Sequence, residues 1–325
     1  MCGAMSRLSL AAFILLLAST SLAAAPIPAD NPATGSGMVS TQLQTIVNRA
    51  VSSTLEQFAT KKLQSNQLAV TLIDLRDFKR PTQASYRGDV PIYPASVVKL
   101  FYLAAAHQWM EDGKLTDTPE LRRAMRDMIV ESYNEATHYI VDLLTGTTSG
   151  PELPDAEIDQ WFDKRNAVNR HFVSLGYTNI NANKKPWCEG PYGRESQSIK
   201  RHKPSRNMLT TDATARLLTE IVSAKSVTAR RSTEMLELMR RDPFKKIEEG
   251  GEPDQGNAFT GLALRDNPGA KLWSKAGWTS QTRHDAAYVE LPNGARFVLV
   301  TFTTDHANER GIIESVARQV IRGLE

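Results

Sequence analysis

The chain has 325 residues, of which 41% are hydrophobic and 23% charged, and its formal net charge is +3. This composition is ordinary for a globular protein and is enough for one large domain or two lobes. The charges of both signs are interspersed and only 7% of residues are aromatic, which argues against a nucleic-acid-binding protein.

The N-terminal segment predicts export. Arg7 precedes an almost wholly apolar run at 8–22, and three alanines follow at 23–25. A positive start, an apolar core and small residues are typical of a secretory signal peptide. The core has about 15 residues, which is short for a membrane-spanning helix of roughly 20, although a retained membrane anchor is the alternative. We expect a signal peptide at 1–25, a periplasmic or extracellular protein, and no stable membrane insertion after cleavage.

The remaining cysteine and the histidines predict no disulfide and no metal. Only Cys188 follows the signal peptide, so an internal disulfide is impossible. A small apolar residue is the expected role of Cys188, ahead of a catalytic thiol. The six histidines show no pair at metal-ligand spacing. We therefore expect neither a metal nor a cofactor, and a monomeric protein.

The spacing of apolar residues predicts the elements in chain order. After a flexible leader at 26–40, helical spacing occurs at 42–58, 97–110, 119–129, 135–144, 159–175, 211–224, 231–240 and 309–323. Strand-like segments are 68–75, 83–86, 271–276, 286–291 and 297–303, with a hairpin turn at 292–294. Residues 176–209 have little periodicity and are predicted to form a long irregular loop, a kind of segment that is usually functional or disordered.

Strands near both ends and helices between them predict an α/β (α+β) fold of two lobes within a domain at 41–325. We expect an α/β lobe at about 41–95 and 211–325, with an antiparallel sheet flanked by helices. An all-helical lobe is expected at about 96–210.

A serine and a lysine three residues apart begin the second predicted helix. Ser96 and Lys99 lie in the segment YPASVVKLF at 93–101. Positions i and i+3 lie on one helix face, so the amine can reach the hydroxyl. A neutral lysine can take the proton of the serine, which is otherwise too weak a nucleophile at neutral pH. Taken alone, the pair is better explained by an ordinary helix start, with Ser96 as the cap and Lys99 solvated.

Further motifs occur in a matching order. Ser132-Tyr133-Asn134 follows a helical segment, Lys275-Ala276-Gly277 lies in a strand-like segment, and Thr282-Arg283-His284-Asp285 comes shortly after it. Together with the Ser-x-x-Lys motif, they resemble the class A β-lactamases and the related penicillin-recognising serine hydrolases. The resemblance covers roughly residues 41–325. It implies the same two-lobed architecture, with the active site in the cleft between the lobes.

The resemblance implies acyl transfer through an ester on a serine, with a β-lactam or a peptidoglycan peptide as substrate. The implied catalytic residues are Ser96 as nucleophile, Lys99 as base, Ser132 as proton donor to the leaving nitrogen and Lys275 as electrostatic support. The implied substrate-binding residues are Asn134 for the substrate's side-chain amide, Gly277, Trp278, and Arg283 for the carboxylate. The backbone N–H groups of Ser96 and Trp278 would form the oxyanion hole. Individually, Asn134 could be a helix cap, Arg283 a solvated charge and Lys275 a strand-edge residue.

The chain departs from the family pattern in three places. Ala276 stands where a threonine is usual, and only 36 residues separate Ser96 from Ser132. The Glu-x-x-Leu-Asn motif that carries the deacylating glutamate of class A enzymes has no clear match. Glu189 is the predicted replacement and Glu195 the second choice, with an exposed loop glutamate as the alternative interpretation.

Three functions remain open at this point. The first is a secreted class A-like β-lactamase, which hydrolyses its acyl-enzyme. The second is a D,D-carboxypeptidase or a related peptidoglycan serine hydrolase, which the missing glutamate motif favours. The third is a non-catalytic β-lactam-binding module, although the intact Ser96 and Lys99 argue against it.

Overall fold

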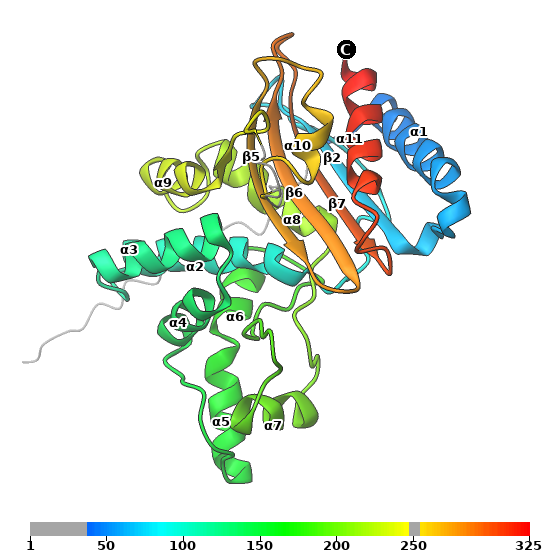
Figure 1. The fold of residues 1–325 in the computed structure, drawn as a ribbon. Coiled ribbons are helices and arrows are strands. Elements are labelled where there is room, and N and C mark those ends of the chain that lie inside the picture. The colour runs from blue at the N-terminus through cyan, green and yellow to red at the C-terminus, as the bar shows by residue number, and fades with distance from the viewer. Residues whose placement is uncertain (1–37, 247–253) are drawn as a thin grey trace, which may run out of the picture. The chain divides into compact units, whose positions relative to one another are not determined.

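The structure is a computed structural model that describes residues 38–246 and 254–325 (Figure 1). The predicted signal peptide at 1–25 and most of the predicted leader lie outside the described residues. Among the described residues, no helix has the length and apolar character needed to cross a membrane.

A seven-stranded sheet forms the centre of the fold, in the order β1-β3-β2-β7-β6-β5-β4. The strands are β1 (Met38–Val39), β2 (Leu68–Asp74), β3 (Thr82–Tyr86), β4 (Arg240–Arg241), β5 (Lys271–Trp278), β6 (Thr282–Glu290) and β7 (Arg296–Thr304). All neighbours are antiparallel except β1 and β3. Segments from the two halves of the described chain meet where β2 pairs with β7. The pairing runs the whole length of β2, from Leu68 opposite Thr303 to Asp74 opposite Phe297. This confirms the predicted mixed fold with an antiparallel sheet.

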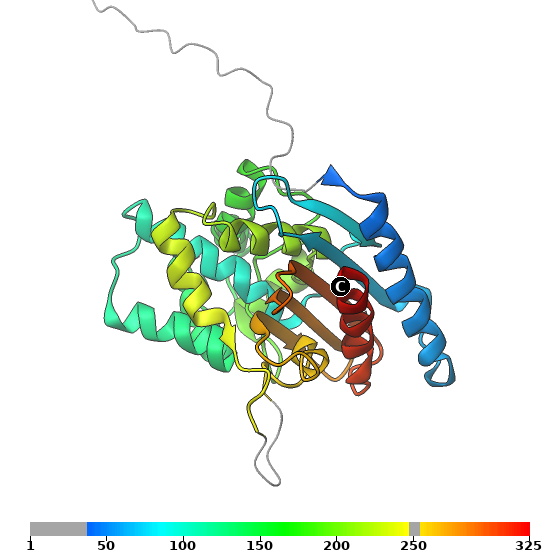
Figure 2. The same cartoon turned by 90° about the horizontal axis from the view of Figure 1, so that it is seen from above.

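Two terminal helices cover one face of the sheet. α1 (Thr41–Gln57) and α11 (Gly311–Leu324) pack against each other there (Figure 1 and Figure 2). Alternate residues of a strand point to opposite faces, and the strands follow this rule. Leu68, Val70 and Leu72 enter the core shared with α1 and α11, while Ala69 and Ile73 enter the core on the other face.

The other face of the sheet packs against helices from the middle of the chain. The helices in contact with this face are α8 (Thr211–Val222) and α9 (Ala229–Met239). The same core includes α2 (Lys99–Glu111), α3 (Pro119–Arg126), α4 (Asn134–Thr145) and α6 (Ala167–Ser174). α2 is buried on all sides from Lys99 to His107. A helix that is apolar all round is stable only in such an interior position. One core runs from the sheet through α2 into these helices, so the predicted lobe boundaries stay a prediction.

The structure corrects two of the predicted elements. The helix expected at 159–175 is two helices, α5 (Asp155–Arg165) and α6, separated at Asn166. The Asn166 side chain accepts hydrogen bonds from Asn169 and Asn183, and such local side-chain bonding competes with a continuous helix. The irregular loop expected at 176–209 contains a helix, α7 (Gly193–Arg201).

Several short elements had no signal in the sequence. They are β1, β4, α10 (Thr260–Ala263) and two 3₁₀ turns at Ala59–Lys61 and Ser65–Gln67. In addition, a π-helical turn at Asp127–Glu131 replaces the end of the helix predicted at 119–129, and a 3₁₀ turn at Ala95–Val98 replaces the first turn of the helix predicted at 97–110.

Candidate active site

Ser96 lies at the entrance to the buried helix α2. It belongs to the 3₁₀ turn at Ala95–Val98, which leads directly into Lys99. Ala95 has a φ of +45°, a conformation that costs a residue with a side chain free energy and that often marks a functional site. Ser96 is half-buried, and its Oγ has no hydrogen-bond partner among residues 38–246 and 254–325. The hydroxyl is therefore available to a ligand.

Lys99 is fully buried one helical turn later. Its Nζ donates to the carbonyl oxygen of Ser132 (2.6 Å), to Asn134 Oδ1 (2.9 Å) and to Ser132 Oγ (3.3 Å). Burial lowers the pKa of Lys99 from 10.5 to about 7, against the smaller opposite effects of Cys188 and Glu135. A substantial fraction of Lys99 is therefore neutral near pH 7, as a base requires.

Ser132 brings the two lysines together. It follows the π-helical turn at Asp127–Glu131 and has a φ of +62°, and π-helical turns are frequent at functional sites. Its Oγ accepts hydrogen bonds from Lys275 Nζ at 2.9 Å and from Lys99 Nζ at 3.3 Å. Burial lowers the pKa of Lys275 well below its ordinary value, and the positive charges of Lys99 and Arg241 lower it further. The predicted Ser132 and Lys275 are thus in direct contact.

Gly277 lies where β5 approaches the nucleophile. A Cβ atom there would come within 2.8 Å of both Ser96 N and Pro94 O, distances that real Cβ atoms do not adopt. Thr279 N donates to Thr282 O in the following hairpin, so the next pair along the strands, Trp278 and Arg283, is not hydrogen-bonded. The Trp278 N–H therefore points away from β6. This geometry is compatible with the predicted oxyanion hole.

Arg283 and His284 project from opposite faces of β6. His284 is opposite Gly277, accepts from Thr303 N at Nδ1 (3.1 Å) and donates from Nε2 to Tyr93 O (2.9 Å). Burial lowers the pKa of His284 to about 4, so the ring is neutral. Arg283 donates to Ala307 O (2.8 Å) and lies over the Phe259 ring. The side chain beside the Ser96 segment is thus His284, and carboxylate binding by Arg283 stays a prediction.

Asn134 links the lysine to the irregular loop. Its Oδ1 accepts from Lys99, and its Nδ2 donates to Cys188 Sγ at 3.1 Å. Cys188 is exposed, which corrects the expectation of a small apolar residue. Glu189 is also exposed, and its carboxylate makes no hydrogen bond or ion pair with any described residue. The loop therefore presents a thiol to Asn134, and the role of Glu189 stays a prediction.

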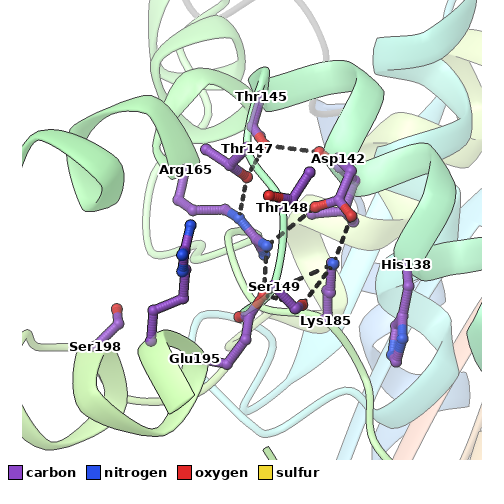
Figure 3. A network of polar contacts seen from close by, with 12 residues as sticks. His138, Asp142, Thr145, Thr147, Thr148, Ser149, Arg165, Lys185, Glu195 and Ser198 are labelled. Atoms are coloured by element: carbon purple, nitrogen blue, oxygen red, sulfur yellow. Dashed lines mark hydrogen bonds and ion pairs between the residues drawn. The ribbon is translucent and has the colours of Figure 1, made fainter. Parts of the chain in front are cut away.

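A buried polar network anchors that loop (Figure 3). Arg165, which has no exposed surface, pairs with Glu195 of α7 and with Asp142 of α4. Lys185 donates to Asp142 Oδ2 at 2.6 Å and to Ser149 Oγ at 2.8 Å. Glu195 is only 2% exposed and is engaged in this network. The residues at both ends of 186–194 are thus fixed to the helices, and Glu195 holds the loop.

Gln255 is a part of the site that the sequence did not indicate. Its side-chain oxygen accepts a hydrogen bond from Lys275 Nζ at 2.9 Å. Gln255 belongs to no recognised motif, and its partners lie up to 126 residues away in the chain. Within the described ranges, no group of His, Cys, Asp or Glu is arranged to hold a metal ion.

Comparisons with known proteins agree with this geometry. Residues 116–324 match the sequence model of a family described as the beta-lactamase enzyme family. Three of the similar solved structures are a β-lactamase from Sphaerobacter thermophilus (17% identity, TM-score 0.60), a mutant of PBP-A as its acyl-enzyme with penicillin G (18%, 0.61) and a β-lactamase from Chitinophaga pinensis (18%, 0.58). Each alignment covers 86% of this chain, and 96%, 96% and 98% of the respective structure. Identities this low establish a shared fold. No curated protein sequence gives a significant match.

Substitution Glu195→Gln tests the anchoring network. It leaves Asp142 as the remaining carboxylate partner of the buried Arg165 guanidinium among the described residues, and removing one member of a buried ion-pair network costs up to about 3–5 kcal/mol. Urea denaturation would measure the loss of unfolding free energy. Glu157→Gln, at an exposed position of α5, removes the same charge and is expected to cost less than about 1 kcal/mol. Equal losses in the two variants would contradict the anchoring role of Glu195.

Proposed function

The chain belongs to the beta-lactamase enzyme family and is a serine hydrolase of the beta-lactamase type, and from this premise we propose that it is exported and opens β-lactam rings through an ester on Ser96. The export rests on the predicted signal peptide at 1–25. We further propose that the enzyme works as a monomer in the periplasm or outside the cell.

The observation that carries the proposal is the chain of contacts from Lys99 through Ser132 to Lys275. In the acylation step, neutral Lys99 takes the proton of Ser96 as Oγ bonds to the β-lactam carbonyl carbon. The carbonyl oxygen becomes negatively charged, and the N–H groups of Ser96 and Trp278 stabilise it.

Ring opening then requires a proton on the leaving nitrogen. When the C–N bond breaks, Ser132 Oγ donates its proton to this nitrogen. Ser132 is replenished from protonated Lys99, which lies 3.3 Å away, so the amine returns to its neutral form. Lys275 stabilises the negative charge that builds up on Ser132 Oγ during this transfer, because its amine lies 2.9 Å from that oxygen.

One observation favours a second candidate, a D,D-carboxypeptidase or a related peptidoglycan hydrolase. The loop residue in contact with Asn134 is Cys188, whereas class A hydrolysis of the ester uses a loop carboxylate as base. Such an enzyme would share the acylation chemistry and would release the β-lactam product slowly.

Ser96→Ala is expected to abolish covalent attachment of a β-lactam. Intact-protein mass spectrometry of the mature enzyme with a chromogenic cephalosporin would detect the adduct, and the absorbance change would report hydrolysis in parallel. Fast product release with a transient adduct supports a β-lactamase, and a long-lived adduct supports the second candidate. Absence of an adduct on the folded wild-type protein would disprove the proposed chemistry.

The acylation rate should rise with pH through about 7. The protonated amine of Lys99 cannot accept the serine proton, and burial lowers the pKa of this amine to about 7. Below that pH the rate is therefore expected to fall about tenfold per pH unit, and above it the rate should level off. Stopped-flow acylation between about pH 5 and 9 would measure the profile. A rate that stays constant across this range would exclude Lys99 as the base.

Cys188→Glu should speed release of the acyl-enzyme. It introduces a carboxylate next to Asn134 and Lys99, where it can activate a water molecule, and general-base catalysis of this kind is worth about 10²–10⁴-fold. The decay of the mass-shifted adduct measures the effect. Glu189→Gln is the companion variant. If Glu189→Gln traps the adduct and Cys188→Glu changes nothing, Glu189 is the deacylation base and the second candidate loses its support.

A further inference from the structure

The side-chain amide of Gln255, which contacts Lys275, makes four hydrogen bonds. Gln255 is 6% exposed and lies in the loop that precedes α10. Its Oε1 accepts from Lys275 Nζ (2.9 Å) and from Ala276 N (3.0 Å). Its Nε2 donates to Val130 O (2.8 Å) and to Ile129 O (3.2 Å). The partners fix the orientation of the amide, because two donors face the oxygen and two acceptors face the nitrogen.

The groups on the oxygen side belong to an open edge of the sheet. β4 pairs with β5 only at Leu272 and Trp273, so the Ala276 N–H has no strand partner on that edge. An unpaired buried backbone N–H costs about as much as a lost hydrogen bond. Gln255 satisfies this N–H and holds the Lys275 amine at the same time.

The groups on the nitrogen side belong to the end of the π-helical turn before Ser132. The last carbonyl groups of a helix have no partner within the helix, and here Ile129 and Val130 carry two of them. Arg241 also donates to Ile129 O at 2.9 Å. The Gln255 amide thus connects the strand that carries Lys275 to the turn that presents Ser132.

No other common side chain satisfies all four partners. A carboxylate would turn its second oxygen toward two carbonyl oxygens, and an apolar side chain would leave two donors and two acceptors without partners. Asparagine is one methylene shorter and cannot span the same gap.

We propose that Gln255 is a positioning residue that sets the contact between Lys275 Nζ and Ser132 Oγ, and thereby the proton transfer during acylation. The inference rests on the proposed function. A displacement of about 1 Å at a reacting group can lower a rate about 10²-fold. The main effect of Gln255 should therefore be on the chemical step, with little effect on non-covalent binding.

The test compares Gln255→Met and Gln255→Glu with Asn257→Leu. Asn257 is a buried amide in the same loop, and its side chain donates to Lys245 O, away from Lys275. Stopped-flow kinetics would separate the acylation rate constant from the dissociation constant of the non-covalent complex. We expect Gln255→Met to lower the rate constant about 10- to 100-fold with little change in that dissociation constant, and Asn257→Leu to leave both unchanged in the folded fraction.

Gln255→Glu keeps both acceptor bonds and adds a negative charge beside Lys275, whose other charged neighbours are Lys99, Arg241 and Asp285. It should retain more activity than Gln255→Met, and it should raise the titration midpoint of Lys275 in ¹⁵N NMR of the lysine amines. The signal is assigned by its loss in Lys275→Met. This readout needs no substrate, and it covers the case in which Gln255→Met does not fold.

The outcomes separate the two proposals. If wild-type enzyme forms no adduct on Ser96, the proposed function fails. The ¹⁵N NMR titration of Lys275 then remains as the test of the contact between Gln255 and Lys275. If wild type reacts while both Gln255 variants acylate at its rate with an unchanged Lys275 midpoint, the positioning role is disproved. Slower acylation in the folded Gln255 variants, with Asn257→Leu like wild type, supports it.

Discussion

Two lysine amines share one serine hydroxyl in a water-poor site, and the rest of the structure depends on holding them there. Lys99 and Lys275 have no exposed surface, and each has three oxygen acceptors. Burying an amine is costly unless it is neutral or fully hydrogen-bonded. Because burial disfavours the charged form of the amine, it makes neutral Lys99 available as a base near pH 7. Burial of both amines also requires rigid surroundings that supply the hydrogen-bond acceptors.

Those surroundings come from three distant parts of the chain. The all-round apolar helix α2 carries Lys99, and the antiparallel pair of β5 and β6 carries Lys275. The π-helical turn leads directly into Ser132, whose backbone is left-handed. The pairing of β2 with β7 joins the first and last parts of the fold into one sheet. A local change in any of these elements therefore displaces the groups around Ser132 Oγ, even where none of the motif residues is altered.

Periodicity was enough to predict the main helices and strands, because the central strands and the amphipathic helices α1 and α11 bury faces that the sequence marks clearly. Spacing within a motif likewise indicated Ser96 with Lys99. The missed features depend on contacts between distant residues. The Asn166 break needs the side chain of Asn183, and Gln255 has a role only once β5 and the π-helical turn are in place. The faces of Arg283 and His284 follow from the hairpin register, which the motif alone does not specify.

The close approach of Gly277 to the Ser96 backbone has a consequence for how this wall of the site can evolve. Any side chain at that position meets main-chain atoms at 2.8 Å, so selection for new substrates cannot act there without displacing the nucleophile. Of its two neighbours, Ala276 is fully buried while Trp278 is 51% exposed. Among these three positions, adaptive variation is thus confined to Trp278, and the substrate range of descendants would be tuned there.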